Sequence, residues 1–197
     1  MVAFKAVLVE KALAIRLVLT DCDGVLTDGS VYYSAEGEQM KRFFIRDGMG
    51  VERLRVLRGI ETGIVTGEMS ESVRRRAEKL KITELHLGCK EKLALVKALA
   101  KRLALRLDEL AYIGDDVNDA EVLKVVGLSA CPEDAESEVK GIVNMVCSKP
   151  GGRGAFRELA EFIILSQQAS QTTERPQVSG KTLSAFQDEV VSMGVKS

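Results

Sequence analysis

Two aspartates separated by a single residue follow an apolar run near the start of the chain. Residues 15–19 are apolar except for Arg16, which predicts a strand buried on both faces, and Asp21, Asp23 and Gly24 come shortly after it. Carboxylates this close repel each other unless a shared proton or a cation compensates, and their oxygens suit a hard divalent metal such as Mg²⁺. The pair therefore indicates either a site in which Asp21 attacks a phosphoryl group and Asp23 transfers protons, or an acidic surface turn.

Two further predicted strands also end in polar turns. Residues 60–65 are followed by the sequence TGE, and residues 111–113 by the sequence GDDVND. Ligands bind where the carboxyl ends of parallel strands meet, because the loops converge at that edge of the sheet. Three polar strand ends therefore favour one shared catalytic site over three unrelated turns.

Strands alternate with helices over most of the chain. Such alternation predicts a parallel sheet covered by helices on both faces, which is a three-layer, Rossmann-like α/β fold. The predicted strands are residues 15–19, 60–65, 85–87, 111–113, 128–130 and 142–147, and the predicted helices are residues 51–57, 72–80, 91–105, 120–126, 135–140 and 156–165. We expect one domain over residues 1–165, with a short helix or lead-in before Ile15, and a flexible or non-core tail over residues 166–197.

Residues 30–34 and 40–44 interrupt this alternation. Both are rich in strand-forming residues and flank the turn AEGE, which predicts a β-hairpin over about residues 30–45. A two-stranded element cannot bury its own aromatic side chains. We therefore expect the hairpin to contact another subunit.

Composition excludes several classes of partner. The 28 basic and 29 acidic residues give a formal charge of −1, so no net field attracts nucleic acid or an anionic membrane. The four cysteines are scattered without a C-x-x-C pair, which argues against a zinc site and predicts reduced cysteines. Residues 1–19 contain charges that rule out a membrane span, and we expect a cytoplasmic protein.

The motifs occur in the order found in a known superfamily. Asp21-x-Asp23, Thr66-Gly67, Lys92 at the start of a helix and the GDDVND turn together resemble the four motifs of the haloacid dehalogenase superfamily. The stretches TDCDGVLTDG, RDG at 46–48 and GGRGAFRE at 151–158 resemble, more narrowly, its small branch of sugar-acid phosphate phosphatases. The resemblance covers about residues 15–165 and implies the haloacid dehalogenase fold with a protruding hairpin and no cap domain.

The resemblance assigns catalytic roles to several of these residues. It implies that Asp21 is the nucleophile and forms an aspartyl-phosphate, and that Asp23 protonates the departing alkoxide and then activates water. Thr66 and the Gly67 amide would donate hydrogen bonds to the phosphoryl group, and Lys92 would balance its charge. Thr-Gly pairs and helical lysines are common, so each of these signals is weak by itself.

The same resemblance implies a Mg²⁺ site. Asp21, the backbone carbonyl of Asp23 and Asp115 would hold the metal, and Asp116 and Asp119 would hold its water or support its ligands. Capping of a helix N-terminus is the alternative role for the acids of the GDDVND turn.

Substrate binding and assembly are also implied by the resemblance. Phe44, Ile45, Arg46, Asp47 and Gly48 would line the substrate pocket. Arg76 matches a basic position that would meet a substrate carboxylate from an adjacent subunit, although the run of arginines at 74–76 also fits a solvated helix face. The implied assembly is a homotetramer in which the hairpin and the segment beyond Gly151 close a neighbouring site.

One position departs from the pattern of the enzymes that act on 3-deoxy-D-manno-octulosonate 8-phosphate. There the residue after Thr-Gly is typically arginine, whereas this chain has Glu68, and Glu52 replaces another pocket arginine. Glu68 with Lys79 instead resembles the enzymes that act on 2-keto-3-deoxynononate 9-phosphate. We therefore expect the nine-carbon ester to be preferred, with the eight-carbon ester as the alternative.

Other classes of protein fit the sequence less well. A receiver-type phosphoacceptor domain has its acceptor aspartate alone on a later strand, and a mutase of the superfamily needs a cap insertion that follows neither Gly29 nor Gly67. An inactive tetramerisation module, of the kind fused to sugar-acid cytidylyltransferases, is disfavoured by the complete motifs. The single histidine, His86, lies between two leucines, which predicts a structural or surface role.

Overall fold

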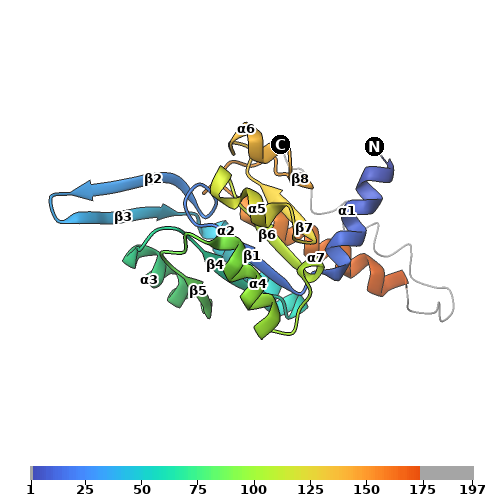
Figure 1. Ribbon diagram of the computed structural model, residues 1–197. Coiled ribbons are helices and arrows are strands. Elements are labelled where there is room, and N and C mark those ends of the chain that lie inside the picture. Colours follow the sequence, from blue (N-terminus) through green and yellow to red (C-terminus); the bar gives the residue numbers. More distant parts are fainter. Residues whose placement is uncertain (1, 174–197) are drawn as a thin grey trace, which may run out of the picture.

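The computed structural model describes residues 2–173 of the chain, and within them a parallel sheet of six strands forms the centre (Figure 1). Its strand order is β5-β4-β1-β6-β7-β8, and every neighbouring pair is parallel. The strands are β1 (Leu17–Thr20), β4 (Glu61–Val65), β5 (Glu84–His86), β6 (Leu110–Ile113), β7 (Leu128–Cys131) and β8 (Met145–Val146). The predicted α/β architecture is confirmed, and β1 lies at its centre.

Helices cover both faces of the sheet, because the strands bury apolar side chains on both sides. On β1, Val18 belongs to one core and Leu19 to the other, as the alternation along a strand requires. The first core contains side chains from α1 (Val2–Ala14), α2 (Ile45–Arg58), α3 (Glu71–Leu80) and α7 (Ala155–Thr173). The second contains side chains from α4 (Lys92–Arg102), α5 (Ala120–Leu123) and α6 (Ser137–Lys140). Two short 3₁₀ turns, η1 (Leu107–Glu109) and η2 (Val117–Asp119), flank β6.

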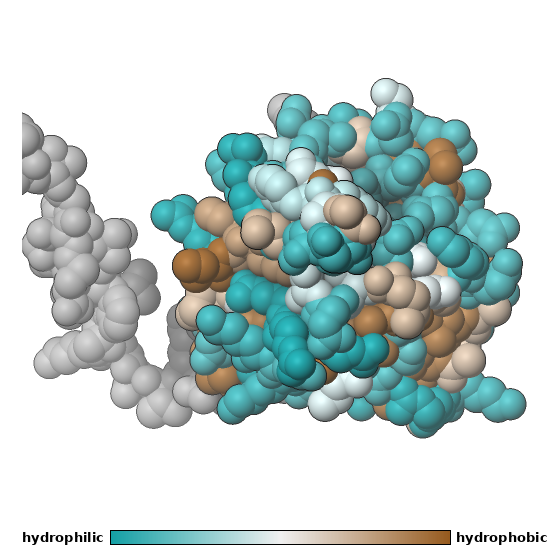
Figure 2. Space-filling model, turned by 90° about the vertical axis from the view of Figure 1, so that its left-hand side faces the viewer, coloured by the Kyte–Doolittle hydropathy of each residue, from teal (hydrophilic) through white to brown (hydrophobic). Residues whose placement is uncertain are grey.

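The predicted hairpin is present and projects from the body of the molecule (Figure 1). It consists of β2 (Thr27–Ser34) and β3 (Gly37–Phe43), which pair antiparallel. Tyr32, Tyr33 and Met40 are more than half exposed on it. Figure 2, which views the molecule from the hairpin side, shows apolar surface interspersed with hydrophilic surface.

Two helices are longer than the sequence pattern indicates. Helix α2 begins at Ile45 and runs through two glycines, where the sequence predicted a start at residue 51. Gly50 has a packing reason, because a Cβ there would lie 3.2 Å from the backbone of Arg157 on α7. The pattern therefore misplaced this helix start, since glycine here serves the close approach of two helices rather than a break.

Helix α7 continues to Thr173, eight residues beyond its predicted end. Ser166 is buried, and the Gln167 amide donates to the carbonyl oxygens of Ala12 and Ile15 at 3.1 and 3.0 Å. Ser166 and Gln167 therefore pack on the domain, although the sequence predicted a non-core tail from residue 166, and residues 174–197 of that tail lie outside the described residues. Over residues 2–173, none of the helices has the length and apolar character needed to cross a membrane.

Candidate active site

A cavity of about 320 Å³ lies at the carboxyl edge of the sheet, where the loops after β1, β4 and β6 converge. Short strands with buried side chains deliver the polar residues to this edge as the chain leaves each strand. Its lining consists of Asp21, Asp23, Gly24, Gly29, Thr66, Gly67, Glu68, Cys89, Lys90, Lys92, Asp115, Asp116 and Asn118. The three predicted polar strand ends are therefore brought together.

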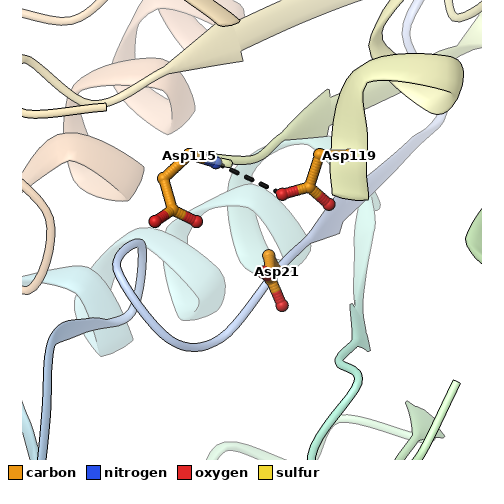
Figure 3. Close-up of side chains that lie close together, drawn as sticks. All are labelled: Asp21, Asp115 and Asp119. Atoms are coloured by element: carbon orange, nitrogen blue, oxygen red, sulfur yellow. Dashed lines mark hydrogen bonds between the residues drawn. The ribbon is translucent and has the colours of Figure 1, made fainter. Parts of the chain in front are cut away.

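Three carboxylates form a cluster in this region (Figure 3). Oxygen atoms of Asp21, Asp115 and Asp119 all lie within 4.8 Å of one another. Asp119 is fully buried, and its Oδ2 accepts a hydrogen bond from the Asp115 amide at 3.3 Å. The sequence predicts a supporting role for Asp119, and in the structure its carboxylate has an oxygen within 4.8 Å of both other carboxylates.

Burial and mutual repulsion change the acidity of this cluster. Burial, followed by repulsion from Asp119, raises the pKa of Asp21 to about 7, although Lys92 opposes the shift. Burial, followed by repulsion from Asp21 and Asp119, raises the pKa of Asp115 to about 8. The cluster therefore requires positive charge if all its members are to be ionised at neutral pH.

Lys92 supplies part of that charge from the first residue of α4. Its buried ammonium lies 3.0 Å from Asp21 Oδ2 and 2.7 Å from Asp119 Oδ1. Burial lowers the pKa of Lys92, but the two carboxylates outweigh it and raise the pKa overall. The Tyr112 hydroxyl also donates to Asp119 Oδ1, at 2.5 Å, a contact that no sequence signal indicated.

The remaining oxygens fit a hard divalent cation. Asp115 Oδ1 is buried and has no hydrogen-bond partner among the described residues, which is a costly state for a carboxylate oxygen. A Cβ on Gly24 would lie 2.0 Å from Asp115 Oδ2, so the loop after β1 has a glycine where that carboxylate needs space. Asp21 and Asp115 are thus the residues that would hold Mg²⁺, beside Asp119. Asp116 is exposed at the rim, and its side chain accepts a hydrogen bond from the Val117 amide as the cap of η2.

The Asp23 carboxylate lies outside the cluster and is paired with the hairpin. Lys41 of β3 is buried, and its ammonium lies 2.6 Å from both oxygens of Asp23. The Thr27 hydroxyl donates to Asp23 Oδ1 at 3.3 Å. Sequence reasoning missed Lys41, because a lysine in a strand gives no sign that it faces inward.

Thr66 and its neighbours form a further part of the cavity wall. Thr66 is buried after β4, and its hydroxyl accepts a hydrogen bond from the Glu68 amide at 3.3 Å. Glu68 is largely exposed, and its Oε1 lies 4.0 Å from the ammonium of Lys90, a second cation at the rim that the sequence analysis did not single out. Both residues line the cavity.

Residues 44–48 do not line this cavity. Phe44 precedes α2, Ile45 is exposed, and the Arg46 guanidinium lies 5.9 Å from the Phe44 ring centre. Asp47 is buried and accepts hydrogen bonds from the Gly154 and Arg157 amides at 3.2 and 2.9 Å, so it caps the N-terminus of α7. Its burial raises its pKa to about 6 in spite of these two donors. Within this chain Asp47 therefore caps α7, and its predicted contact with substrate stays a prediction.

The basic residues of α3 lie away from the cluster in the single chain. The Arg76 guanidinium donates to the Phe44 carbonyl at 3.3 Å and lies 5.6 Å from the Phe43 ring centre, so it holds the base of the hairpin against α3. Gly48 makes room for it, since a Cβ there would lie 2.5 Å from the guanidinium. Lys79 is exposed, and His86 on β5 lies 3.1 Å from Glu84 Oε2, outside the lining of the cavity.

Comparisons with known proteins agree with this geometry. Residues 88–157 match the family model described as haloacid dehalogenase-like hydrolase. The chain is 39% identical to 3-deoxy-D-manno-octulosonate 8-phosphate phosphatase KdsC of Escherichia coli (strain K12) over 159 residues, which are 81% of this chain and 84% of that protein. It is 38% identical to the protein of that name in Haemophilus influenzae, over 91% of this chain and 96% of that one.

A solved structure extends the similarity to the fold. The phosphatase of the same name from Moraxella catarrhalis, in complex with magnesium ion, phosphate ion and a KDO molecule, is 34% identical with a TM-score of 0.78, over 85% of this chain and 98% of that one. This chain therefore belongs to the haloacid dehalogenase-like hydrolases, in the branch that contains the 3-deoxy-D-manno-octulosonate 8-phosphate phosphatases.

Proposed function

We propose that this protein is a Mg²⁺-dependent phosphomonoesterase that hydrolyses a 2-keto-3-deoxy sugar-acid phosphate through an aspartyl-phosphate on Asp21. The observation that carries the proposal is the cluster of Asp21, Asp115 and Asp119 around the Lys92 ammonium, at the sheet edge where the Thr66 loop also ends. Bound Mg²⁺ supplies positive charge that neutralises the phosphoryl oxygens and lets an anionic nucleophile approach.

The side chains of this site account for both halves of the reaction. An Asp21 oxygen attacks phosphorus, the bond from phosphorus to the sugar oxygen breaks, and Asp23 gives its proton to that oxygen. Water then attacks phosphorus, Asp23 takes a proton from that water, and the bond from phosphorus to the Asp21 oxygen breaks. Inorganic phosphate leaves, and Asp21 is again a free carboxylate. Thr66 and the Gly67 amide donate to the phosphoryl oxygens, and Lys92 favours the ionised form of Asp21.

The eight-carbon ester, 3-deoxy-D-manno-octulosonate 8-phosphate, is the substrate that we propose first, because the curated relatives reported above carry its name. The nine-carbon ester, expected from Glu68 and Lys79, remains a second candidate. The observation that favours it is the place of Glu68 in the cavity wall. A carboxylate there accepts hydrogen bonds from substrate hydroxyls, whereas an arginine would donate them.

We also propose that the hairpin mediates a homotetramer, as the family resemblance implies. Tyr32, Tyr33 and Met40 support it, since their side chains are more than half exposed on an element too thin to bury them. Neighbouring subunits would then supply the cover that a protein without a cap domain lacks. The cytoplasmic location remains a prediction, supported by four cysteines that are all free.

The test measures release of inorganic phosphate from both esters, with Mg²⁺ and with a chelator. We expect the wild-type protein to release phosphate when Mg²⁺ is present and not when the chelator is present. Asp21→Asn should fold but should release no phosphate. Turnover by Asp21→Asn would contradict the nucleophile assignment. Glu68→Arg should raise the ratio of kcat/KM for the eight-carbon ester over the nine-carbon ester, and an unchanged ratio would remove Glu68 as a determinant of specificity.

A further inference from the structure

Lys41 makes the closest charged contact to the proposed acid and base. It lies on β3, its side chain is 1% exposed, and its ammonium is 2.6 Å from each Asp23 oxygen. Lys41 does not line the cavity, whereas Asp23 does. Any effect of Lys41 on the reaction must therefore pass through Asp23 rather than through direct contact with substrate.

The second partner of Lys41 ties this pair to the rest of the fold. Glu38 lies three residues before Lys41 on β3, with its Oε2 3.6 Å from the Lys41 ammonium. The other oxygen of Glu38 accepts a hydrogen bond from the hydroxyl of Ser70, the cap of α3. Lys41 is thus held from two sides, and the hairpin is joined by side chains to both the loop after β1 and the loop after β4.

Proton transfer to a leaving oxygen requires that the acid point at that oxygen while the nucleophile attacks. Asp23 is bound by the Thr27 hydroxyl at a long 3.3 Å, and so the Lys41 contact to both oxygens is the one that sets the plane of its carboxyl group. A displacement of about 1 Å in a reacting group can reduce the rate about 10²-fold.

We infer that Lys41 is a positioning residue for Asp23, so that the base of the hairpin orients the acid and base of the reaction within the same subunit. The inference rests on the proposed function and deepens it. It assigns to the hairpin a role in catalysis that is separate from any contact with a neighbouring subunit.

The test compares two phosphate esters whose leaving groups differ. An alkyl ester such as 3-deoxy-D-manno-octulosonate 8-phosphate needs a proton on its leaving oxygen, whereas p-nitrophenyl phosphate releases a stable anion. General acid catalysis contributes about 10²- to 10⁴-fold, so Lys41→Met should lower kcat/KM for the alkyl ester by about 10- to 100-fold. For p-nitrophenyl phosphate the change should stay within about threefold.

Arg42→Met is the matched control. Arg42 is the next residue on the same strand, half exposed, and its guanidinium lies 2.6 Å from Asp28, so its loss removes a hairpin ion pair without touching Asp23. Both kcat/KM values should stay at the wild-type level in this variant. Circular dichroism and Tm establish that both variants fold, and a crystal structure of Lys41→Met should show the Asp23 carboxylate displaced.

A double-mutant cycle tests whether the effect of Lys41 on the rate depends on Asp23. In an Asp23→Asn background, Lys41→Met should cause no further loss, because the group it positions is already gone. Equal losses on both esters, additive losses in the cycle, or an Asp23 carboxylate that has not moved would each overturn the inference. Failure of the proposed substrate would instead appear in the wild-type protein, and the comparison would then use any alkyl phosphate that the wild type hydrolyses.

Discussion

Substitution of Gly24 tests the metal site, because Gly24 leaves the space that the Asp115 carboxylate occupies. Gly24 has φ +80°, and an alanine Cβ there would lie 2.0 Å from Oδ2 and 2.5 Å from Cγ of Asp115. Because Cγ itself is too close, rotation of the carboxyl group cannot relieve the clash, and the whole Asp115 side chain must move. Gly24→Ala should therefore weaken Mg²⁺ binding and lower kcat by about 10²-fold.

The same substitution also strains the backbone, and Gly59→Ala controls for that strain. Gly59 has φ +64°, and a Cβ there would meet nothing within 4 Å. Each alanine should lower the free energy of unfolding by about 1–2 kcal/mol, since both adopt the left-handed conformation. Urea unfolding, kcat and the Mg²⁺ concentration for half-maximal activity should be measured on both variants. If Gly24→Ala matched Gly59→Ala in kcat and Mg²⁺ requirement, Asp115 would not be the ligand that we describe.

Three further outcomes follow from the same geometry. Lys92→Met removes the cation between Asp21 and Asp119, so the free energy of unfolding should fall by about 3–5 kcal/mol in urea titrations, and unchanged stability would contradict this role. Without divalent cation, Tm should fall as pH rises between about 4 and 8, because the raised pKa values of about 7 for Asp21 and 8 for Asp115 mean that the folded state binds more protons than the unfolded state. Mg²⁺ competes with those protons, so its addition should raise Tm more at pH 8 than at pH 6, and an equal rise would count against the site. Asp47→Ala should lower the free energy of unfolding by about 1–2 kcal/mol through loss of the α7 cap, whereas a higher KM at unchanged stability would contradict the capping role and support the predicted substrate contact.

The order of elements and the location of the site could be read from the sequence. Buried strands show as short apolar runs, and a polar turn directly after such a run must lie at the carboxyl edge of a parallel sheet. The sequence therefore predicts that Asp21, Thr66 and Asp115 lie close together, because that prediction needs only the local pattern and the sheet topology. The hairpin could also be predicted from the sequence, since its strand-forming residues flank a glycine-containing turn.

What the sequence could not supply are the side-chain directions that depend on packing between distant elements. The pairing of Lys41 with Asp23, and the capping of α7 by Asp47, join segments whose separation along the chain carries no information about contact. The extension of α2 through Gly48 and Gly50 has the same cause, because helix propensity is overridden where another helix or an arginine must come close. Local pattern determined which residues carry the chemistry, and only the tertiary structure decided which cation each carboxylate faces, because Coulomb and hydrogen-bond energies depend on distance in space and not on position in the chain.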